Sequence, residues 1–260
     1  MEVSVIIPFN NQAAILKRNI AMIHSYLNQN YKTFEIIAID DGSSDDTLKI
    51  LTKLKIPELH IISYHKHRGR GYAIRKGIFA SNGENIVCLD DIVSYSPTYI
   101  KACINSLNYC DITLASRYLY KGISYNNQVP KTLISKFYNF LIRLLLKIKT
   151  TDFECGFRGF KADIAREVFA KQELHKTGFE LEMLKYAKQN DFNIVEFPIK
   201  SEETSLTKYS SKEFIKMMFC IFKLTTKSRG DAWAFQRNAT AERQKQRNIQ
   251  IQEKGILVCQ

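Results

Sequence analysis

Short apolar segments alternate along the chain with segments whose apolar residues recur at helical spacing. Val3–Pro8 is a β-branched run typical of a buried strand, and residues 12–28 follow with apolar side chains three to four residues apart. Strands that alternate with helices pair in parallel, so the pattern predicts an α/β fold with a doubly wound, mostly parallel sheet flanked by helices. The same succession predicts strands at Phe34–Ile39, Leu59–Tyr64, Asn85–Leu89 and Asp111–Ala115, and helices at Asp45–Leu54, Tyr72–Ala80 and Ile100–Leu107.

Polar residues cluster where the predicted strands end, at Pro8–Asn11, Asp40–Ser44, His65–Gly71 and Asp90–Asp91. Ligands of open parallel sheets bind beyond the carboxyl ends of the strands, so we expect the binding site there. The first of these turns contains no glycine. This excludes the G-x-G-x-x-G turn of dinucleotide-binding folds, in which backbone approaches a pyrophosphate.

Two segments of the second half, Ser135–Ile148 and residues 210–227, predict amphipathic helices with a basic face. Each alone could be a core-packed helix with a solvated edge, but two of them favour contact with a membrane surface. Beyond residue 228 the chain is polar, and we expect a mobile tail. The basic residues are Lys136, Arg143 and Lys147 in the first helix and Lys212, Lys216, Lys223 and Lys227 in the second.

Charge indicates the chemistry of the partner. The 38 Lys and Arg residues against 26 Asp and Glu give a net charge of +12, which predicts an anionic partner. We do not expect nucleic acid, because the cations follow helix faces and no recognition motif accompanies them. The longest apolar-rich stretches are broken by cations and fall short of the ~20 residues of a spanning helix. No signal peptide opens the chain, so we expect a cytoplasmic protein, peripheral on the cytoplasmic face of a membrane.

The six cysteines form no C-x-x-C pair, so we expect buried free thiols in a reducing compartment rather than disulfides or a zinc site.

The motifs VIIPFNN, IAIDDGSSDDT, HRGRGYAIRKG and CLDD follow one another in the first half, and ASRY, TDFECGFRGF and GFELEMLKYAKQNDFNIVEFPI follow in the second. In order and spacing they resemble the inverting family 2 glycosyltransferases, which have a GT-A fold. They are similar in particular to the polyprenyl-phosphate and dolichyl-phosphate hexose synthases, and the third motif to the dolichyl-phosphate glucosyltransferases. The resemblance implies a GT-A domain over 1–209, with a nucleotide-sugar half at 1–95 and an acceptor half at 96–209.

On the donor side, the resemblance implies a nucleotide-sugar site at the strand ends. Asp40 and Asp41 would accept hydrogen bonds from base and ribose. Because Asp41 also suits turn formation, and Ser43 and Ser44 suit capping of the next helix, we expect Asp40 to be the more purely ligand-facing acid. Cations at the start of a helix favour a diphosphate. The residues implied are Pro8, Asn10, Asp40, Asp41, Gly69, Arg70 and Arg75.

Asp90 ends the fourth strand, where the family's Asp-x-Asp motif holds Mg2+ or Mn2+ against the diphosphate. Here the chain departs from the family, because the second aspartate of the motif falls on Ile92, which cannot bind a metal. Three alternatives follow: Asp91 takes its place, Asp90 acts with phosphates alone, or catalysis is impaired. We expect Asp90, Asp91 and Arg117 to be catalytic, with Asp90 and Asp91 as the metal ligands.

A lipid monophosphate acceptor is already ionised, so it requires cations that orient it rather than a strong base. Arg117 follows a strand and Arg158 lies in a segment that we interpret as a glycine-flanked loop. The acceptor-phosphate residues implied by the resemblance are Arg117, Lys131, Ser135, Arg158 and Lys208.

The favoured interpretation is transfer of a hexose, with inversion, from a nucleotide diphosphate sugar to polyprenyl or dolichyl phosphate. UDP-glucose is favoured over GDP-mannose, because Glu202 stands where mannose-transferring relatives tend to have arginine. Two alternatives stay open. A family 2 enzyme acting on a hydroxyl acceptor would need Glu180 or Glu182 as its base, and a degenerate nucleotide-sugar binder would have lost its metal.

Overall fold

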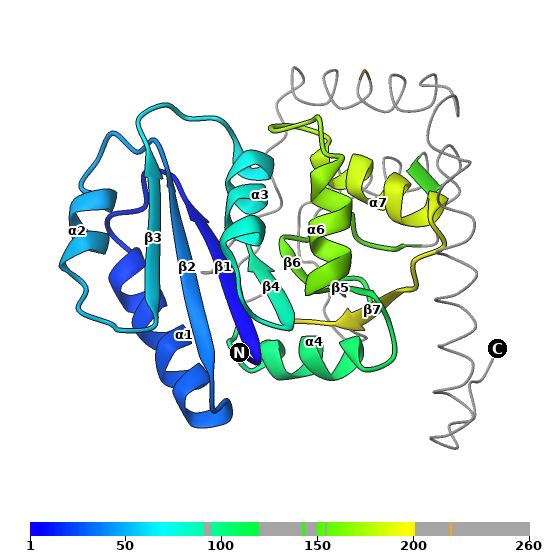
Figure 1. Cartoon of the computed structure of the whole chain (residues 1–260), viewed down its shortest axis with the longest axis horizontal. Coiled ribbons are helices and arrows are strands. Elements are labelled where there is room, and N and C mark those ends of the chain that lie inside the picture. Colours follow the sequence, from blue (N-terminus) through cyan, green and yellow to red (C-terminus); the bar gives the residue numbers. More distant parts are fainter. Residues whose placement is uncertain (91–94, 120–141, 144–149, 154, 201–218, 220–260) are drawn as a thin grey trace, which may run out of the picture.

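The computed structural model describes residues 1–90, 95–119, 142–143, 150–153, 155–200 and 219. Within this part of the chain, a mixed seven-stranded sheet has the order β3-β2-β1-β4-β6-β5-β7 and is covered by helices on both faces (Figure 1). The strands are β1 (Val3–Phe9), β2 (Phe34–Asp41), β3 (Leu59–Tyr64), β4 (Asn85–Leu89), β5 (Ile112–Ser116), β6 (Phe157–Lys161) and β7 (Ile194–Pro198). The helices are α1 (Leu16–Asn30), α2 (Thr47–Lys53), α3 (Arg70–Ala80), α4 (Tyr99–Leu107), α6 (Ala162–Ala170) and α7 (Phe179–Gln189).

The first four strands run parallel, as the alternating pattern predicted. Side chains along a strand point alternately to its two faces, so Val5 and Ile7 of β1 pack with α1, while Ile6 packs with Ile74 of α3. Both faces of β1 are therefore buried by helices, which explains why it is apolar throughout. The expected doubly wound architecture is confirmed, although α1 begins at Leu16 rather than near residue 12.

Strand β6 was not predicted. It runs antiparallel between β4 and β5, and it contains Arg158, so the interpretation of this segment as a loop is wrong. Glycine in a sequence usually indicates a loop. At position 159, however, the strand needs a glycine, because a Cβ there would collide with Cys103 Sγ and with Thr113 Cγ2. The glycine thus allows α4 and β5 to pack closely against the middle of the sheet.

Several expectations fall outside the described residues. The two basic helices are described only at Ile142 and Arg143 and at Phe219, which are helical; Ile142 is buried and Arg143 is exposed. The tail beyond 228 is not described, and the division of 1–209 into halves stays a prediction. Within the described residues, no helix combines the length and hydropathy needed to cross a bilayer.

The prediction of buried thiols is confirmed for the four described cysteines, Cys88, Cys103, Cys110 and Cys155, which are buried and form no disulfide. Burial raises the pKa of Cys88 to about 12 and that of Cys155 to about 11, so both stay protonated at neutral pH. Cys220 and Cys259 lie outside the described residues.

Candidate active site

The ends of β1 and β2 meet at the carboxyl edge of the sheet. Pro8 pairs with Ile39 and Phe9 with Asp40 in the parallel register, so the residues that follow each strand are neighbours. Asn10 donates a hydrogen bond from Nδ2 to the carbonyl oxygen of Asp41 over 2.8 Å. The structure thus brings together Pro8, Asn10, Asp40 and Asp41, as predicted.

Asp40 is buried, and its carboxylate fixes the turn that follows β2. Oδ1 accepts from the Ser43 N–H at 3.2 Å, and Oδ2 accepts from the Ser63 hydroxyl at 3.0 Å. The turn-forming contact therefore belongs to Asp40, and the expected assignment of that role to Asp41 is wrong. The expected capping of α2 by serines is also wrong, because that helix begins at Thr47, whose N–H donates to Asp45.

Asp41 holds the loop that leads into α3. Its carboxylate oxygens accept from the backbone N–H groups of Arg68 at 2.7 Å and Gly69 at 2.9 Å, and His67 Nδ1 lies 2.9 Å from Oδ2. Gly69 has a φ of +104°, which a side chain rarely permits, and a Cβ there would lie 2.6 Å from the His175 carbonyl oxygen. This loop therefore places Arg70 in the first turn of α3 with little backbone freedom.

Four charged side chains, Arg70, Asp90, Arg158 and Glu180, form what we call the central charge cluster. Arg70 Nη1 lies 2.8 Å from Asp90 Oδ2, and its Nη2 lies 3.6 Å from Glu180 Oε1. Arg158 Nη2 approaches the same Glu180 oxygen at 3.9 Å, and its guanidinium stacks 5.7 Å above the Phe179 ring. The sequence predicted the first three as site residues from separate motifs, and the fold brings all four together.

Burial distinguishes the members of this cluster. The side chains of Asp90 and Arg158 are 2% and 4% exposed, whereas Arg70 is 53% exposed. Desolvation raises the pKa of the Glu180 carboxyl, while the charges of Arg158 and Arg70 oppose that rise. The two arginines thus favour the ionised form of Glu180, against the effect of burial.

Asp90 is suited to bind a hard divalent cation. It offers carboxylate oxygens at the end of β4, and Mg2+ typically uses one or two carboxylates together with substrate phosphates and water. A Cβ on Gly156 would lie 2.5 Å from the Asp90 Cβ, so the glycine is needed beside this acid. Among the described residues no three His, Cys, Asp or Glu side chains converge as a complete metal site, and Asp91 lies outside them.

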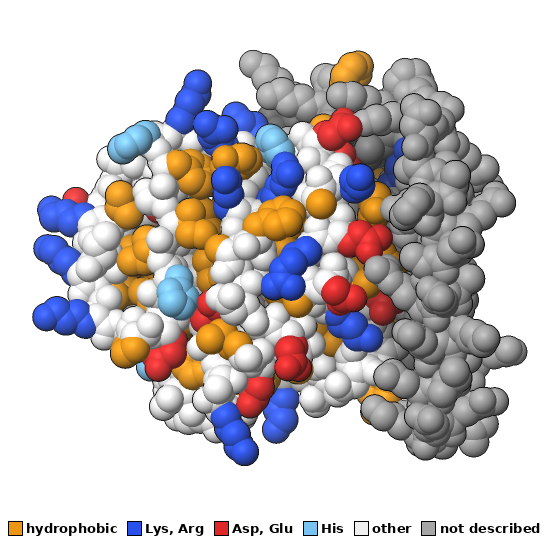
Figure 2. Space-filling model, in the orientation of Figure 1, with side chains coloured by type: hydrophobic (Ala, Val, Ile, Leu, Met, Phe, Trp, Pro, Cys, Tyr) orange, Lys and Arg blue, Asp and Glu red, His pale blue; other side chains and the backbone are white. Residues whose placement is uncertain are grey.

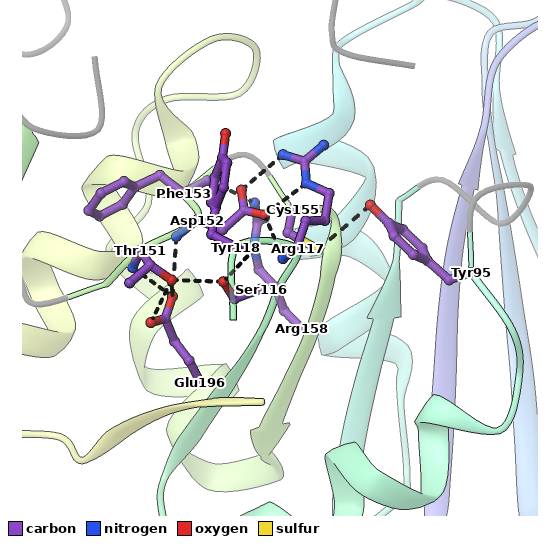
Figure 3. A network of polar contacts seen from close by, with 10 residues as sticks. All are labelled: Tyr95, Ser116, Arg117, Tyr118, Thr151, Asp152, Phe153, Cys155, Arg158 and Glu196. Carbon is purple, nitrogen blue, oxygen red and sulfur yellow. Dashed lines mark hydrogen bonds and ion pairs between the residues drawn. The ribbon is translucent and has the colours of Figure 1, made fainter. Parts of the chain in front are cut away.

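Arg117 follows β5 and is held by Asp152, a residue that sequence reasoning missed (Figure 3). Asp152 Oδ2 accepts from Arg117 Nε at 2.8 Å and from its backbone N–H at 3.1 Å, and Oδ1 accepts from Nη2 at 2.9 Å. The pair is bidentate and largely buried, a geometry that fixes the plane of the guanidinium. Asp152 lies in the TDFECGFRGF motif, but nothing in that motif indicated that it pairs with Arg117.

Glu196 of β7 accepts hydrogen bonds from the backbone of the segment that carries Asp152. Its Oε1 accepts from the backbone N–H groups of Thr151 at 2.7 Å and Asp152 at 3.2 Å, while the Thr151 and Ser116 hydroxyls lie 2.7 Å apart (Figure 3). Residues from β5, β7 and the segment before β6 are thereby joined. The network therefore orients Asp152, and through it Arg117.

The remaining predicted residues are placed elsewhere or not described. Arg75 lies on α3 about 1.4 turns beyond Arg70, with its guanidinium over the ring of Phe79. Figure 2 shows basic and hydrophobic side chains mixed over the face of the molecule on which Figure 1 shows α3. Glu182, the alternative base, accepts hydrogen bonds from the N–H groups of Glu173 and Leu174 and thus anchors a loop. Asp91, Lys131, Ser135 and Lys208 lie outside the described residues.

Comparison with solved structures defines the class of fold. Glucosyl-3-phosphoglycerate synthase from Mycobacterium tuberculosis, in complex with Mn2+, UDP-glucose and phosphoglyceric acid, superposes with a TM-score of 0.61 at 14% identity, covering 86% of this chain and 79% of that one. Mannosyl-3-phosphoglycerate synthase from Rubrobacter xylanophilus gives a TM-score of 0.61 at 16% identity, covering 96% of this chain and 75% of that one. The expected GT-A glycosyltransferase fold is confirmed.

The family follows from the sequence match. Residues 4–169 match the model of glycosyl transferase family 2, so the chain belongs to that family and is a glycosyltransferase. It is 27% identical over 233 residues to dolichyl-phosphate beta-glucosyltransferase ALG5C of Trichomonas vaginalis, covering 84% of this chain and 68% of the relative. It is 30% identical over 215 residues to human dolichyl-phosphate beta-glucosyltransferase, covering 76% and 66%. The chain thus spans about two thirds of the length of these two relatives.

Proposed function

We propose that this glycosyltransferase transfers glucose from UDP-glucose to the phosphate of dolichyl phosphate, or of another polyprenyl phosphate, with inversion at the sugar carbon. Two curated relatives named as dolichyl-phosphate glucosyltransferases support the acceptor and the sugar. A solved structural neighbour that contains UDP-glucose supports the donor. The observation that carries the proposal is the central charge cluster at the carboxyl edge of the sheet.

The cluster suits a diphosphate donor. Arg70 stands in the first turn of α3, where backbone N–H groups also favour an anion, and Asp90 lies 2.8 Å away. Asp90, with Asp91 as the predicted second ligand, would hold Mg2+ or Mn2+, which would neutralise the diphosphate as the bond to the sugar breaks. Asp40 and Asp41 would accept from base and ribose, beside Pro8, Asn10 and Gly69.

The acceptor half of the site provides cations rather than a base. A phosphate monoester oxygen is ionised near neutral pH and can attack the sugar carbon directly while the nucleoside diphosphate leaves from the opposite face. Arg117 is oriented by Asp152, and Arg158 is 4% exposed beside Glu180. These two arginines, with the predicted Lys131, Ser135 and Lys208, would hold the lipid phosphate in line.

The test is a transfer assay with the full chain, dolichyl phosphate in detergent and radiolabelled UDP-glucose or GDP-mannose, each with Mn2+ or with EDTA. We expect an acid-labile glucolipid from UDP-glucose that depends on the cation. Asp90→Asn should lower the rate by at least about 100-fold, because the ion would lose a charged ligand. A glucolipid formed equally well in EDTA would contradict the metal assignment, and no labelled lipid from either donor would contradict the proposal as a whole.

A hydroxyl acceptor is the second candidate, and it rests on Glu180. This carboxyl has a raised pKa and belongs to the central charge cluster, as a general base would require. Glu180→Gln would then abolish transfer to a hydroxyl acceptor while sparing donor hydrolysis. Under the phosphate-acceptor proposal the same variant retains measurable transfer, because the nucleophile is already ionised.

We also propose that the protein is peripheral on the cytoplasmic face of a membrane and binds it through the predicted basic helices. The support is the helical spacing of their lysines and the net charge of +12. Replacing Lys212, Lys216 and Lys223 together by glutamate should weaken binding to vesicles with 30% anionic lipid by at least about 100-fold, because each lost lysine costs about 1 kcal/mol and each glutamate adds repulsion. Unchanged binding in a flotation assay would contradict the proposal.

A further inference from the structure

Arg70 contacts the carboxylate that the proposed function assigns to a divalent cation. Its Nη1 lies 2.8 Å from Asp90 Oδ2, and the Asp90 side chain is 2% exposed. A buried carboxylate is costly without a nearby positive charge. In the structure the guanidinium of Arg70 supplies that charge.

A divalent cation and a guanidinium on the same carboxylate would repel each other strongly at a distance of a few ångströms. We propose that Arg70 competes with the divalent cation for Asp90: it neutralises the acid when no cation is bound, and it moves to Glu180 when one binds. This inference rests on the proposed function, because it requires that Asp90 binds the metal.

The geometry favours such an exchange. Arg70 Nη2 is already 3.6 Å from Glu180 Oε1, so a small rotation of the side chain brings the guanidinium onto the second carboxylate. The Arg70 side chain is 53% exposed, and it can therefore rotate without opening the core. Its backbone, in contrast, is set by the contacts of Asp41 with the preceding loop.

Arg158 lowers the attraction of Glu180 for Arg70. It lies 3.9 Å from the same Glu180 oxygen and is 4% exposed, so it already neutralises part of the charge of Glu180. Glu180 therefore attracts Arg70 less than Asp90 does, which agrees with the shorter distance from Arg70 to Asp90. The cation must thus displace Arg70 from its preferred partner, and this weakens metal binding in the absence of donor.

The experiment measures Mn2+ affinity directly, by the loss of the electron paramagnetic resonance signal of free Mn2+ on titration with the full chain. We expect Arg70→Gln to bind Mn2+ about three- to tenfold more tightly than the wild type without donor, since the competing cation is gone. The matched control is Lys76→Gln, which removes one charge from the same helix at a side chain that packs on Tyr72. It should leave the affinity within a factor of two.

Glu180→Gln is the converse variant. It removes the carboxylate to which Arg70 would move, so we expect Mn2+ to bind more weakly than to the wild type. Thermal unfolding verifies that the variant is folded. Arg70→Gln with an unchanged or weaker affinity would overturn the inference, provided that Asp90→Asn abolishes the wild-type Mn2+ binding. If the wild type binds no Mn2+ with or without UDP, both the inference and the metal assignment of the proposed function are wrong.

Discussion

Replacing Asp152 by asparagine tests whether Arg117 is held by a buried ion pair. The Asp152 carboxylate accepts three hydrogen bonds from Arg117, at 2.8, 2.9 and 3.1 Å, and the side chain is fully buried. Asparagine has almost the same shape but no charge, and its amide nitrogen is a donor that would face the donors of the guanidinium. The variant therefore removes the pair without creating a cavity.

The magnitude follows from the burial of both partners. Breaking a buried ion pair by removing one partner costs about 3–5 kcal/mol, and a hydrogen bond to a charged group contributes about 1.5–3 kcal/mol. Arg117 is 13% exposed, so water reaches part of its guanidinium, and the asparagine oxygen still accepts one bond. We therefore expect Asp152→Asn to lower the free energy of unfolding by about 2–3 kcal/mol.

Urea unfolding followed by far-ultraviolet circular dichroism measures this loss. The matched control is Asp46→Asn, which removes an ion pair with Lys49 in which both side chains are 65% exposed, and it should cost less than about 0.5 kcal/mol. A double-mutant cycle with Arg117→Gln should give a coupling energy above about 1 kcal/mol. Equal effects of Asp152→Asn and Asp46→Asn would refute the assignment.

Three further substitutions have expected outcomes. Gly156→Ala puts a Cβ 2.5 Å from that of Asp90, so it should cost about 1–3 kcal/mol of stability and weaken Mn2+ binding, as urea unfolding and titration would measure. Gly69→Ala combines a φ of +104° with a contact of 2.6 Å to His175, so calorimetry should show both a loss of about 1–3 kcal/mol and weaker UDP binding. Glu182→Gln weakens hydrogen bonds from two backbone N–H groups and should lower stability by about 1 kcal/mol in urea.

The parallel half of the fold could be predicted because its signals are local. Strands β1, β2 and β4 are buried on both faces along most of their length and consist mainly of apolar residues, and acids stand at the edge where β2 and β4 end. Asp40, Asp41 and Asp90 were therefore found from their position after a strand alone. The assignment of the turn to Asp41 was wrong because the contact depends on side-chain rotamers, which the sequence pattern does not determine.

The antiparallel half could not be predicted in the same way. Strand β6 has five residues, one glycine and a buried arginine, so neither alternation nor an apolar run identifies it. Asp152 lies 35 residues from Arg117, and Glu196 lies 44 residues from Asp152, so no periodic pattern links them. What joins them is the order of β5, β6 and β7 in the sheet, a consequence of packing over the whole chain.

Paired charges explain why the proposed donor should need a cation. Each acid orients its arginine without a bound anion, which fixes the position of the guanidinium. The same pairing neutralises most of the positive charge of the arginines. A diphosphate and a lipid phosphate together bring several negative charges into this balanced site. Under the proposed function, a divalent cation at Asp90 and the predicted Lys131 and Lys208 would supply the missing positive charge. The pairs within the described site are Arg70 with Asp90, Arg117 with Asp152, and Arg158 with Glu180.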